Sequence, residues 1–115
     1  QQAITMRGGF GKAKELLMTG DIIDAQEAER IGLVNKVAPH DKLMETVMEL
    51  AKQLAEGPTY SMALIKRLVH KSLYTDFAES LRLAGPAQAI ARQTEDHREG
   101  VRAFVEKRKP AFQGR

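Results

Sequence analysis

The chain contains no cysteine and no tryptophan, has few aromatic residues, and lacks any long hydrophobic run. The absence of cysteine excludes a disulfide framework and a thiolate zinc site and favours an intracellular protein, so we expect a cytoplasmic location. No apolar run approaches the ~20 residues that a membrane span needs, and we expect no membrane association. Because the first residue is Gln1 rather than methionine, the lack of a signal peptide carries no information.

The remaining composition is that of an ordinary soluble globular protein. With 115 residues, 43% of them hydrophobic and 29% charged, the chain can form one domain with a modest core. The net charge of +3 is mild, yet four basic residues fall within the last nine positions: Lys107, Arg108, Lys109 and Arg115. Such a cluster usually complements a helix dipole and stays solvated, although it could also bind a phosphate.

The spacing of apolar residues predicts an all-α fold of about five to six helices. Three are expected at residues 12–19, 25–31 and 41–56, and three more begin near Thr59, Thr75 and Thr94. Residues 33–37 are predicted to form an extended connector or a short edge strand. A kink or break is expected at Gly85–Pro86, because proline removes a backbone donor and crowds the preceding turn.

The ends of the second helix are the most clearly marked. Asp24 is a typical N-cap with Glu27 three residues later, the spacing of a capping box. Gly20 and Gly32 are placed to close the helices before them in the left-handed conformation, and Leu33 completes the expected pattern of a Schellman motif.

The residue types that carry most catalysis do not fall into recognisable patterns here. His40, His70 and His97 stand far apart and none has a second ligand one helical turn away, so no metal ligand is assigned. Residues 8–12 (GGFGK) fail the spacing of a phosphate-binding loop, and no serine lies in a strained turn. Adjacent acids such as Glu95 and Asp96 are interpreted as capping or solubilising groups. We assign no catalytic residue.

Two segments resemble the crotonase family, the enoyl-CoA hydratases and isomerases. Residues 16–37 (LLMTGDIIDAQEAERIGLVNKV) are similar to a family run "leTG…i.A.eA…GLV..vv", and residues 94–112 (TEDHREGVRAFVEKRKPAF) to the closing "seD..EG..AF.eKR.P.F". The resemblance covers residues 11–112 and corresponds to the C-terminal part, less than half, of a family member. It implies the C-terminal helical region of a crotonase-like (ClpP/crotonase) fold at residues 11–115, preceded by a poorly defined lead-in at 1–10.

The resemblance also implies a division of function. In crotonases two backbone N–H groups hold the thioester oxygen and one or two carboxylates move protons, and these elements lie upstream of this chain. The C-terminal region supplies an aromatic ring and a lysine to the adenine and phosphate end of coenzyme A, often across a subunit boundary. The matching positions are Phe104 and Lys107, with Arg108 or Lys109 as substitutes if the register differs.

Helical spacing is compatible with that assignment, since residues three apart lie on one side of a helix. Core packing is the alternative interpretation of Phe104. The family also lines its acyl-tail pocket with the middle of the preceding long helix, here residues 84–91, but Gly85, Pro86 and polar Gln88 depart from the family pattern. Acyl chain length is therefore not predicted.

Three functional hypotheses follow from the sequence. The leading one is the C-terminal helical domain of an enoyl-CoA hydratase/isomerase family enzyme, inactive alone, with an acyl-CoA thioester as substrate and no cofactor. It implies a homo-oligomer, a trimer or dimer of trimers in the parent, and self-association of the fragment. The alternative is a non-enzymatic helical module that binds itself or a partner. A nucleic-acid binder is disfavoured, because the basic cluster is short and has no interleaved aromatic residues.

Overall fold

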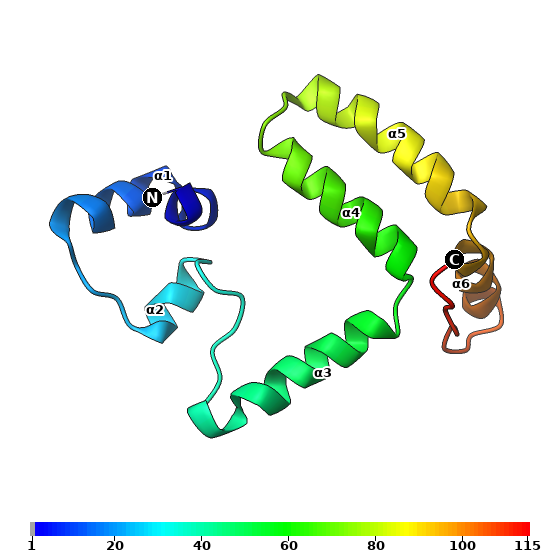
Figure 1. Cartoon of the computed structure of the whole chain (residues 1–115), viewed down its shortest axis with the longest axis horizontal. Helices are drawn as coiled ribbons and strands as arrows, with labels where there is room; N and C mark the ends of the chain where they lie inside the picture. The colour runs from blue at the N-terminus through cyan, green and yellow to red at the C-terminus, as the bar shows by residue number, and fades with distance from the viewer. Residues whose placement is uncertain (1) are drawn as a thin grey trace. The chain divides into compact units, whose positions relative to one another are not determined.

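The computed structural model describes the backbone of residues 2–115 and the side chains of residues 5, 6 and 8–115 (Figure 1). This part of the chain contains helices and turns and no β-strand, so the predicted all-α fold is confirmed. The elements are α1 (Gln2–Thr19), α2 (Ala25–Arg30), a short 3₁₀ helix η1 (His40–Lys42), α3 (Leu43–Ala55), α4 (Thr59–Ser72), α5 (Phe77–Gln93) and α6 (Glu95–Val105). They divide into two compact units, Gln1–Thr46 and Val47–Arg115.

In the first unit, α1 is interrupted once and then closed by a glycine. Gly9 has φ 79° and ψ 163°, which is not a helical conformation. The predicted lead-in therefore contains a short helical stretch that is separate from the helix expected at residues 12–19. At the other end Gly20 takes φ 72°, and its N–H donates to the carbonyl of Leu16 at 3.0 Å. The Lys12 ammonium lies 2.8 Å from Glu15 and 3.7 Å from Glu27, which ties α1 to α2.

Helix α2 has the caps that the sequence predicts. The Glu27 N–H donates to Asp24 Oδ1 at 2.7 Å. At the C-terminus the N–H of Gly32 donates to Glu29 at 3.0 Å and that of Leu33 to Ala28 at 2.8 Å, the two bonds of a Schellman motif. The Glu27 carboxylate also accepts two hydrogen bonds from Arg30, at 2.5 and 2.6 Å.

Of the two alternatives predicted for residues 33–37, the structure shows a connector and no strand. Residues 31–35 form a turn and bends, and residues 36–39 have no regular structure. The physical reason is local: the N–H groups of Leu33 and Val34 both donate to the carbonyl of Ala28, at 2.8 and 3.3 Å. They close the helix and cannot at the same time join a ladder of strand hydrogen bonds.

In the second unit, α4 packs beside α5, and α5 contacts α6 (Figure 1). Asp76 caps α5 by accepting the Glu79 N–H at 2.8 Å, and Thr94 caps α6 by accepting that of His97 at 3.1 Å. Helix α4 begins at Thr59 as predicted, and Pro58 occupies its N-cap position without a side-chain cap bond.

Helix α5 runs through Pro86 without the predicted break. Proline restricts the residue before it partly through a clash with that residue's Cβ. Gly85 has no Cβ, so this part of the clash does not arise at the residue before Pro86. The glycine therefore relieves the constraint that the proline imposes, and only one intrahelical hydrogen bond is lost.

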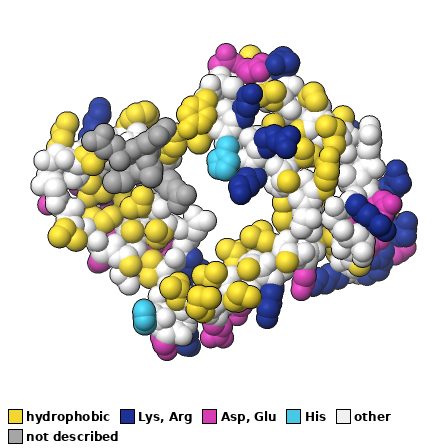
Figure 2. All heavy atoms as spheres, viewed as in Figure 1, with side chains coloured by type: hydrophobic (Ala, Val, Ile, Leu, Met, Phe, Trp, Pro, Cys, Tyr) yellow, Lys and Arg dark blue, Asp and Glu magenta, His cyan; other side chains and the backbone are white. Residues whose placement is uncertain are grey.

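Large apolar side chains remain exposed on this helical frame. The predicted apolar face of α3 is formed by residues that are each about half exposed (Figure 2): Leu43 48%, Val47 48%, Leu50 52% and Leu54 49%. Among the described hydrophobic residues, Ala13 and Ala103 are the ones that are fully buried, at 2% and 1%. The amphipathic pattern is present, but its apolar side lacks the cover that it would have in a large core.

Candidate functional site

The chain after α6 folds back and is held by a buried carboxylate near the start of that helix. Asp96, which is 2% exposed, accepts the backbone N–H groups of Gln113 at 2.6 Å and Gly114 at 2.9 Å. Its own N–H donates to the carbonyl of Arg115 at 2.9 Å. Both carboxylate oxygens are thus satisfied by backbone donors, as burial requires. The interpretation of Asp96 as a capping or solubilising group is therefore wrong.

A second carboxylate one turn later holds the middle of the same segment. Arg108 donates from Nη1 to Glu99 Oε1 at 2.5 Å and from Nη2 to Oε2 at 3.0 Å, a bidentate pair. The N–H of Ala111 donates to the same Oε1 at 3.0 Å. The hydrogen bonds from Arg108 and then from Ala111 lower the pKa of Glu99 to about 2.

Small residues allow the returning segment to lie close against α4 and α6. A Cβ at Gly100 would lie 3.6 Å from the Phe112 ring, so the ring covers this glycine. Gly114 takes φ 77°, and a Cβ there would lie only 2.7 Å from Thr59 Oγ1. Together with the two carboxylates, these contacts make residues 106–115 an ordered strap across the second unit.

The turn that leads into this strap places Lys107 outside the helix. α6 ends at Val105, and Lys107 adopts φ 52°. Its N–H donates to Phe104 at 3.3 Å and that of Arg108 to Ala103 at 3.0 Å, a Schellman motif with lysine at the position that glycine usually takes. The left-handed conformation costs a non-glycine residue about 1–2 kcal/mol. The premise that Phe104 and Lys107 share a helix face is therefore wrong.

The basic residues of the strap differ in whether an acid neutralises them. Arg108 pairs with Glu99 and Glu106, Lys109 Nζ lies 2.6 Å from Glu56, and Arg115 Nε lies 2.9 Å from Glu95. Within the part of the chain that the structure describes, the exposed Lys107 alone of these four has no ion pair. Of the sequence-derived candidates for a phosphate ligand, Lys107 is the one left free, and the substitutes Arg108 and Lys109 are engaged.

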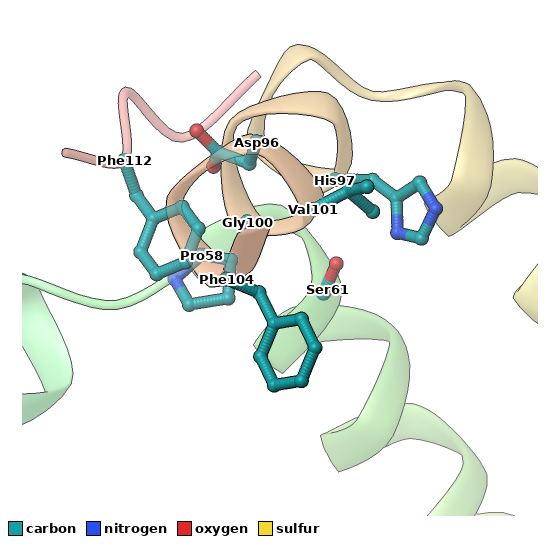
Figure 3. Close-up of a pocket in the computed structure, with 8 residues that line it drawn as sticks. All are labelled: Pro58, Ser61, Asp96, His97, Gly100, Val101, Phe104 and Phe112. Atoms are coloured by element: carbon teal, nitrogen blue, oxygen red, sulfur yellow. The ribbon is translucent and has the colours of Figure 1, made fainter. Parts of the chain in front are cut away.

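Phe104 lines a hollow of about 360 Å³ between α4 and α6 (Figure 3). The residue is 85% exposed, which excludes core packing within this unit. In Figure 3 its ring extends from α6 toward the start of α4, beside Ser61. The remaining lining residues are Pro58, Asp96, His97, Gly100, Val101 and Phe112.

A second, more apolar hollow of about 400 Å³ lies between α4 and α5. Its α5 wall consists of Ala84, Ala87, Gln88 and Ala91, within the segment that the resemblance implies for the acyl tail. The α4 wall consists of Ser61, Leu64, Ile65 and Leu68. Three alanines make the α5 wall shallow, and Gln88 adds one polar group to it.

Among the described residues, no group of three or more histidine, aspartate or glutamate side chains is placed to hold a metal ion. No helix in the same part of the chain is both long enough and apolar enough to cross a bilayer.

Comparison with known proteins identifies the family. The sequence model described as enoyl-CoA hydratase/isomerase matches residues 1–115. This chain belongs to that family. It is 42% identical over 104 residues to a Thermus thermophilus protein named as an enoyl-CoA hydratase, covering 90% of this chain and 41% of the relative. It is 38% identical to the crotonyl-CoA hydratase of Syntrophomonas wolfei, covering 90% of this chain and 40% of that protein.

Solved structures of the family share the helical architecture. A crystal structure of an enoyl-CoA hydratase subunit from Geobacillus kaustophilus superimposes with a TM-score of 0.89 at 40% identity, over 97% of this chain and 44% of that one. The family member from Streptomyces coelicolor gives 0.89 at 38% identity, over 97% and 41%. The fold predicted from the resemblance is confirmed, and the chain spans about two fifths of the length of the relatives that it matches.

The sequence analysis proposed Phe104 and Lys107 as ligand-binding residues and missed the residues that hold the strap. A signal was present: Asp96 and Glu99 stand three apart on one face of α6, and Gly100 follows at once. A glycine beside two acids on one helix face lets another segment approach closely enough to donate hydrogen bonds to them. Acids that only face solvent do not need a glycine beside them.

Proposed function

We propose that this chain is the C-terminal helical part of an enzyme that acts on acyl-CoA thioesters, and that it contributes part of the coenzyme A site. The observation that carries the proposal is an exposed Phe104 followed at the helix end by Lys107, the unpaired cation of the strap. Names of relatives, crotonyl-CoA hydratase and short-chain-enoyl-CoA hydratase, support a thioester substrate. Coenzyme A enters as part of the substrate, and no separate cofactor is proposed.

The two residues suit different parts of one ligand. An exposed aromatic ring offers a flat apolar face on which adenine can stack. A lysine ammonium is a compact, mobile charge with three donors, suited to a phosphate. Because Lys107 follows the helix end, its side chain can turn independently of the face that carries Phe104. Adenine and a nearby phosphate can therefore be bound together even though the residues do not share a helix face.

The proposal is tested by titrating the chain with coenzyme A while following its amide resonances by NMR. The expected result is saturable movement of the resonances of residues 104 and 107, with pantetheine, which lacks adenine, leaving them in place. Lys107→Ala is expected to weaken binding, and Lys109→Ala, the removal of a cation already paired with Glu56, serves as the matched control. Equal affinity of Lys107→Ala and the unaltered chain would refute the site.

The catalytic groups of the proposed enzyme lie upstream of this chain. We therefore expect the isolated chain to leave crotonyl-CoA unchanged, which is measured by the absorbance of the conjugated enoyl thioester. Hydration by the purified chain alone would contradict this assignment. The reaction and the acyl group are properties of the missing part.

Assembly is the second part of the proposal. Several large apolar side chains are almost fully exposed, among them Ile22 at 99%, Met18 at 82% and Phe77 at 79%. Such surfaces favour contact with another protein surface, and we propose homo-oligomerisation, as a trimer or dimer of trimers in the whole enzyme. The same observation supports the second candidate function, a helical module that binds a partner. Light scattering after size exclusion tests both, and a strictly monomeric folded chain at high concentration would contradict self-association.

Nucleic acid is not among the proposed partners. Arg108, Lys109 and Arg115 are each paired with acids, so the basic cluster presents little free charge to a phosphate backbone. The cytoplasmic location expected from the sequence stays a prediction, since one relative, from Pongo abelii, is named as a mitochondrial enzyme.

A further inference from the structure

The strap turns immediately after Lys107, and one carboxylate binds two of the residues that follow the turn, Arg108 and Ala111. Glu99 Oε1 accepts from Arg108 Nη1 at 2.5 Å and from the Ala111 N–H at 3.0 Å. Its other oxygen accepts Arg108 Nη2 at 3.0 Å. The backbone that leaves Lys107 is therefore fixed at the next residue and again three residues further on.

Lys107 needs such support because its own conformation is disfavoured. Among the non-glycine residues that the structure describes, Lys107 is the one with a positive φ, at 52°. A lysine in this region persists where the surrounding structure holds it there. The two bonds of the Schellman motif come from α6 itself, and the additional bonds to Glu99 come from the residues that follow.

Arg108 uses four of its five N–H donors in this arrangement. Its Nε donates to Glu106 Oε2 at 2.5 Å, its two terminal nitrogens donate to Glu99, and Nη1 also lies 3.2 Å from the Lys109 carbonyl. A guanidinium with its donors occupied in this way acts as a brace and has little capacity for a further anion. The adjacent Lys107 ammonium, without an acid partner in the described chain, keeps that capacity.

We propose that Glu99 is a positioning residue for the coenzyme A site: through Arg108 and Ala111 it holds Lys107 in the left-handed conformation that presents its ammonium to a phosphate. This inference rests on the proposed function. It goes beyond that function because Glu99 does not touch the ligand. Glu99 is proposed to affect coenzyme A affinity only through Lys107.

The test is a double-mutant cycle on coenzyme A affinity, measured by NMR titration of the full 115-residue chain. Glu99→Gln keeps the side-chain shape and removes the charge. It is expected to weaken binding at least roughly threefold when Lys107 is present, and by much less when Lys107 is already alanine, since coupled residues are non-additive. Glu79→Gln, the same change at an acid that pairs with Arg82 in α5, is the matched control and is expected to leave affinity unchanged.

A merely structural role would give a different pattern. Equal weakening by Glu99→Gln in both backgrounds would show that Glu99 supports the fold and not Lys107, and would overturn the inference. If Lys107→Ala weakens binding while Glu99→Gln does not, the positioning role fails and the proposed site stands. If Lys107→Ala has no effect, the proposed site itself fails. Should Glu99→Gln not fold, as judged by circular dichroism, Arg108→Lys replaces it in the cycle, because lysine cannot form the two-pronged pair.

Discussion

The backbone N–H of Lys107 donates to the carbonyl oxygen of Phe104 across 3.3 Å, in the turn that closes α6. The two residues proposed to bind coenzyme A are thus joined through the backbone, and the helix end fixes their separation. A change in the geometry of this turn alters the site without altering either side chain.

Replacing Lys107 with glycine is expected to stabilise the fold and weaken coenzyme A binding. Glycine adopts positive φ freely, so relief of the left-handed strain outweighs its greater entropy in the unfolded chain, and the net gain is about 0.5–1 kcal/mol. Urea unfolding measures the gain and ligand titration the loss.

The matched control is Lys109→Gly. Lys109 lies two residues away, and the structure does not give it a positive φ. That variant is expected to be less stable than the unaltered chain. Loss of stability in Lys107→Gly would show that the left-handed conformation carries no strain.

Removing the Asp96 carboxylate is expected to release the strap. Asp96→Ala removes the acceptor of the part-buried N–H groups of Gln113 and Gly114, and losing these two hydrogen bonds is expected to cost about 1–3 kcal/mol. Thermal unfolding measures the loss, and faster hydrogen exchange at these two amides locates it. Glu95→Ala at the neighbouring exposed acid is the control, with an expected effect within about 0.5 kcal/mol. Equal effects of the two changes would contradict the anchoring role of Asp96.

Two glycines in the same unit are expected to respond oppositely to alanine. At Gly100 a Cβ would make an ordinary contact 3.6 Å from Phe112, and the better helix propensity of alanine favours Gly100→Ala by up to about 1 kcal/mol. At Gly114, with φ 77° and Thr59 Oγ1 only 2.7 Å away, alanine is expected to cost at least about 1–2 kcal/mol. The denaturant midpoint is expected to be higher for Gly100→Ala and lower for Gly114→Ala than for the unaltered chain. A stabilised Gly114→Ala variant would refute this prediction.

Acid is expected to loosen the strap through Glu99. Its pKa falls from 4.5 to about 2 on folding, so the unfolded chain binds this proton more tightly than the folded one does. The resulting stabilisation is fully present above about pH 4.5 and is lost as the pH falls toward 2. Comparing the unfolding free energies of the unaltered chain and Glu99→Gln between pH 6 and pH 2 should show their difference shrinking. A constant difference would contradict the assigned pKa.

The parts of the fold that were predicted correctly depend on neighbours in sequence. Asp24 and Gly32 mark the ends of α2 because a cap and a Schellman turn are complete within a few residues. The absence of a strand at residues 33–37 also has a local reason, since the N–H groups of Leu33 and Val34 donate to the carbonyl of Ala28. At Pro86 the general rule was outweighed by the glycine immediately before it.

The candidate site was only partly predictable, because its geometry depends on contacts between distant positions. Phe104 and Lys107 came from the family resemblance, and nothing in their spacing indicated that the helix ends between them. Asp96 is bonded to residues 17 and 18 positions later, and Glu99 to residues 9 and 12 positions later. Asp96, Glu99 and Gly100 together indicate that donor groups approach this face, but no local pattern shows that the donors belong to the segment that returns past the end of α6.

The pairing of cations in the strap also changes how a charged ligand would experience this end of the molecule. Counting residues gives four positive charges within the last nine positions, which would produce strong attraction and a steep dependence of binding on salt. With Arg108, Lys109 and Arg115 each held by acids, the local field is closer to that of a single ammonium. If coenzyme A binds at the proposed site, we expect recognition mainly by contact and an affinity that falls only gently as ionic strength rises.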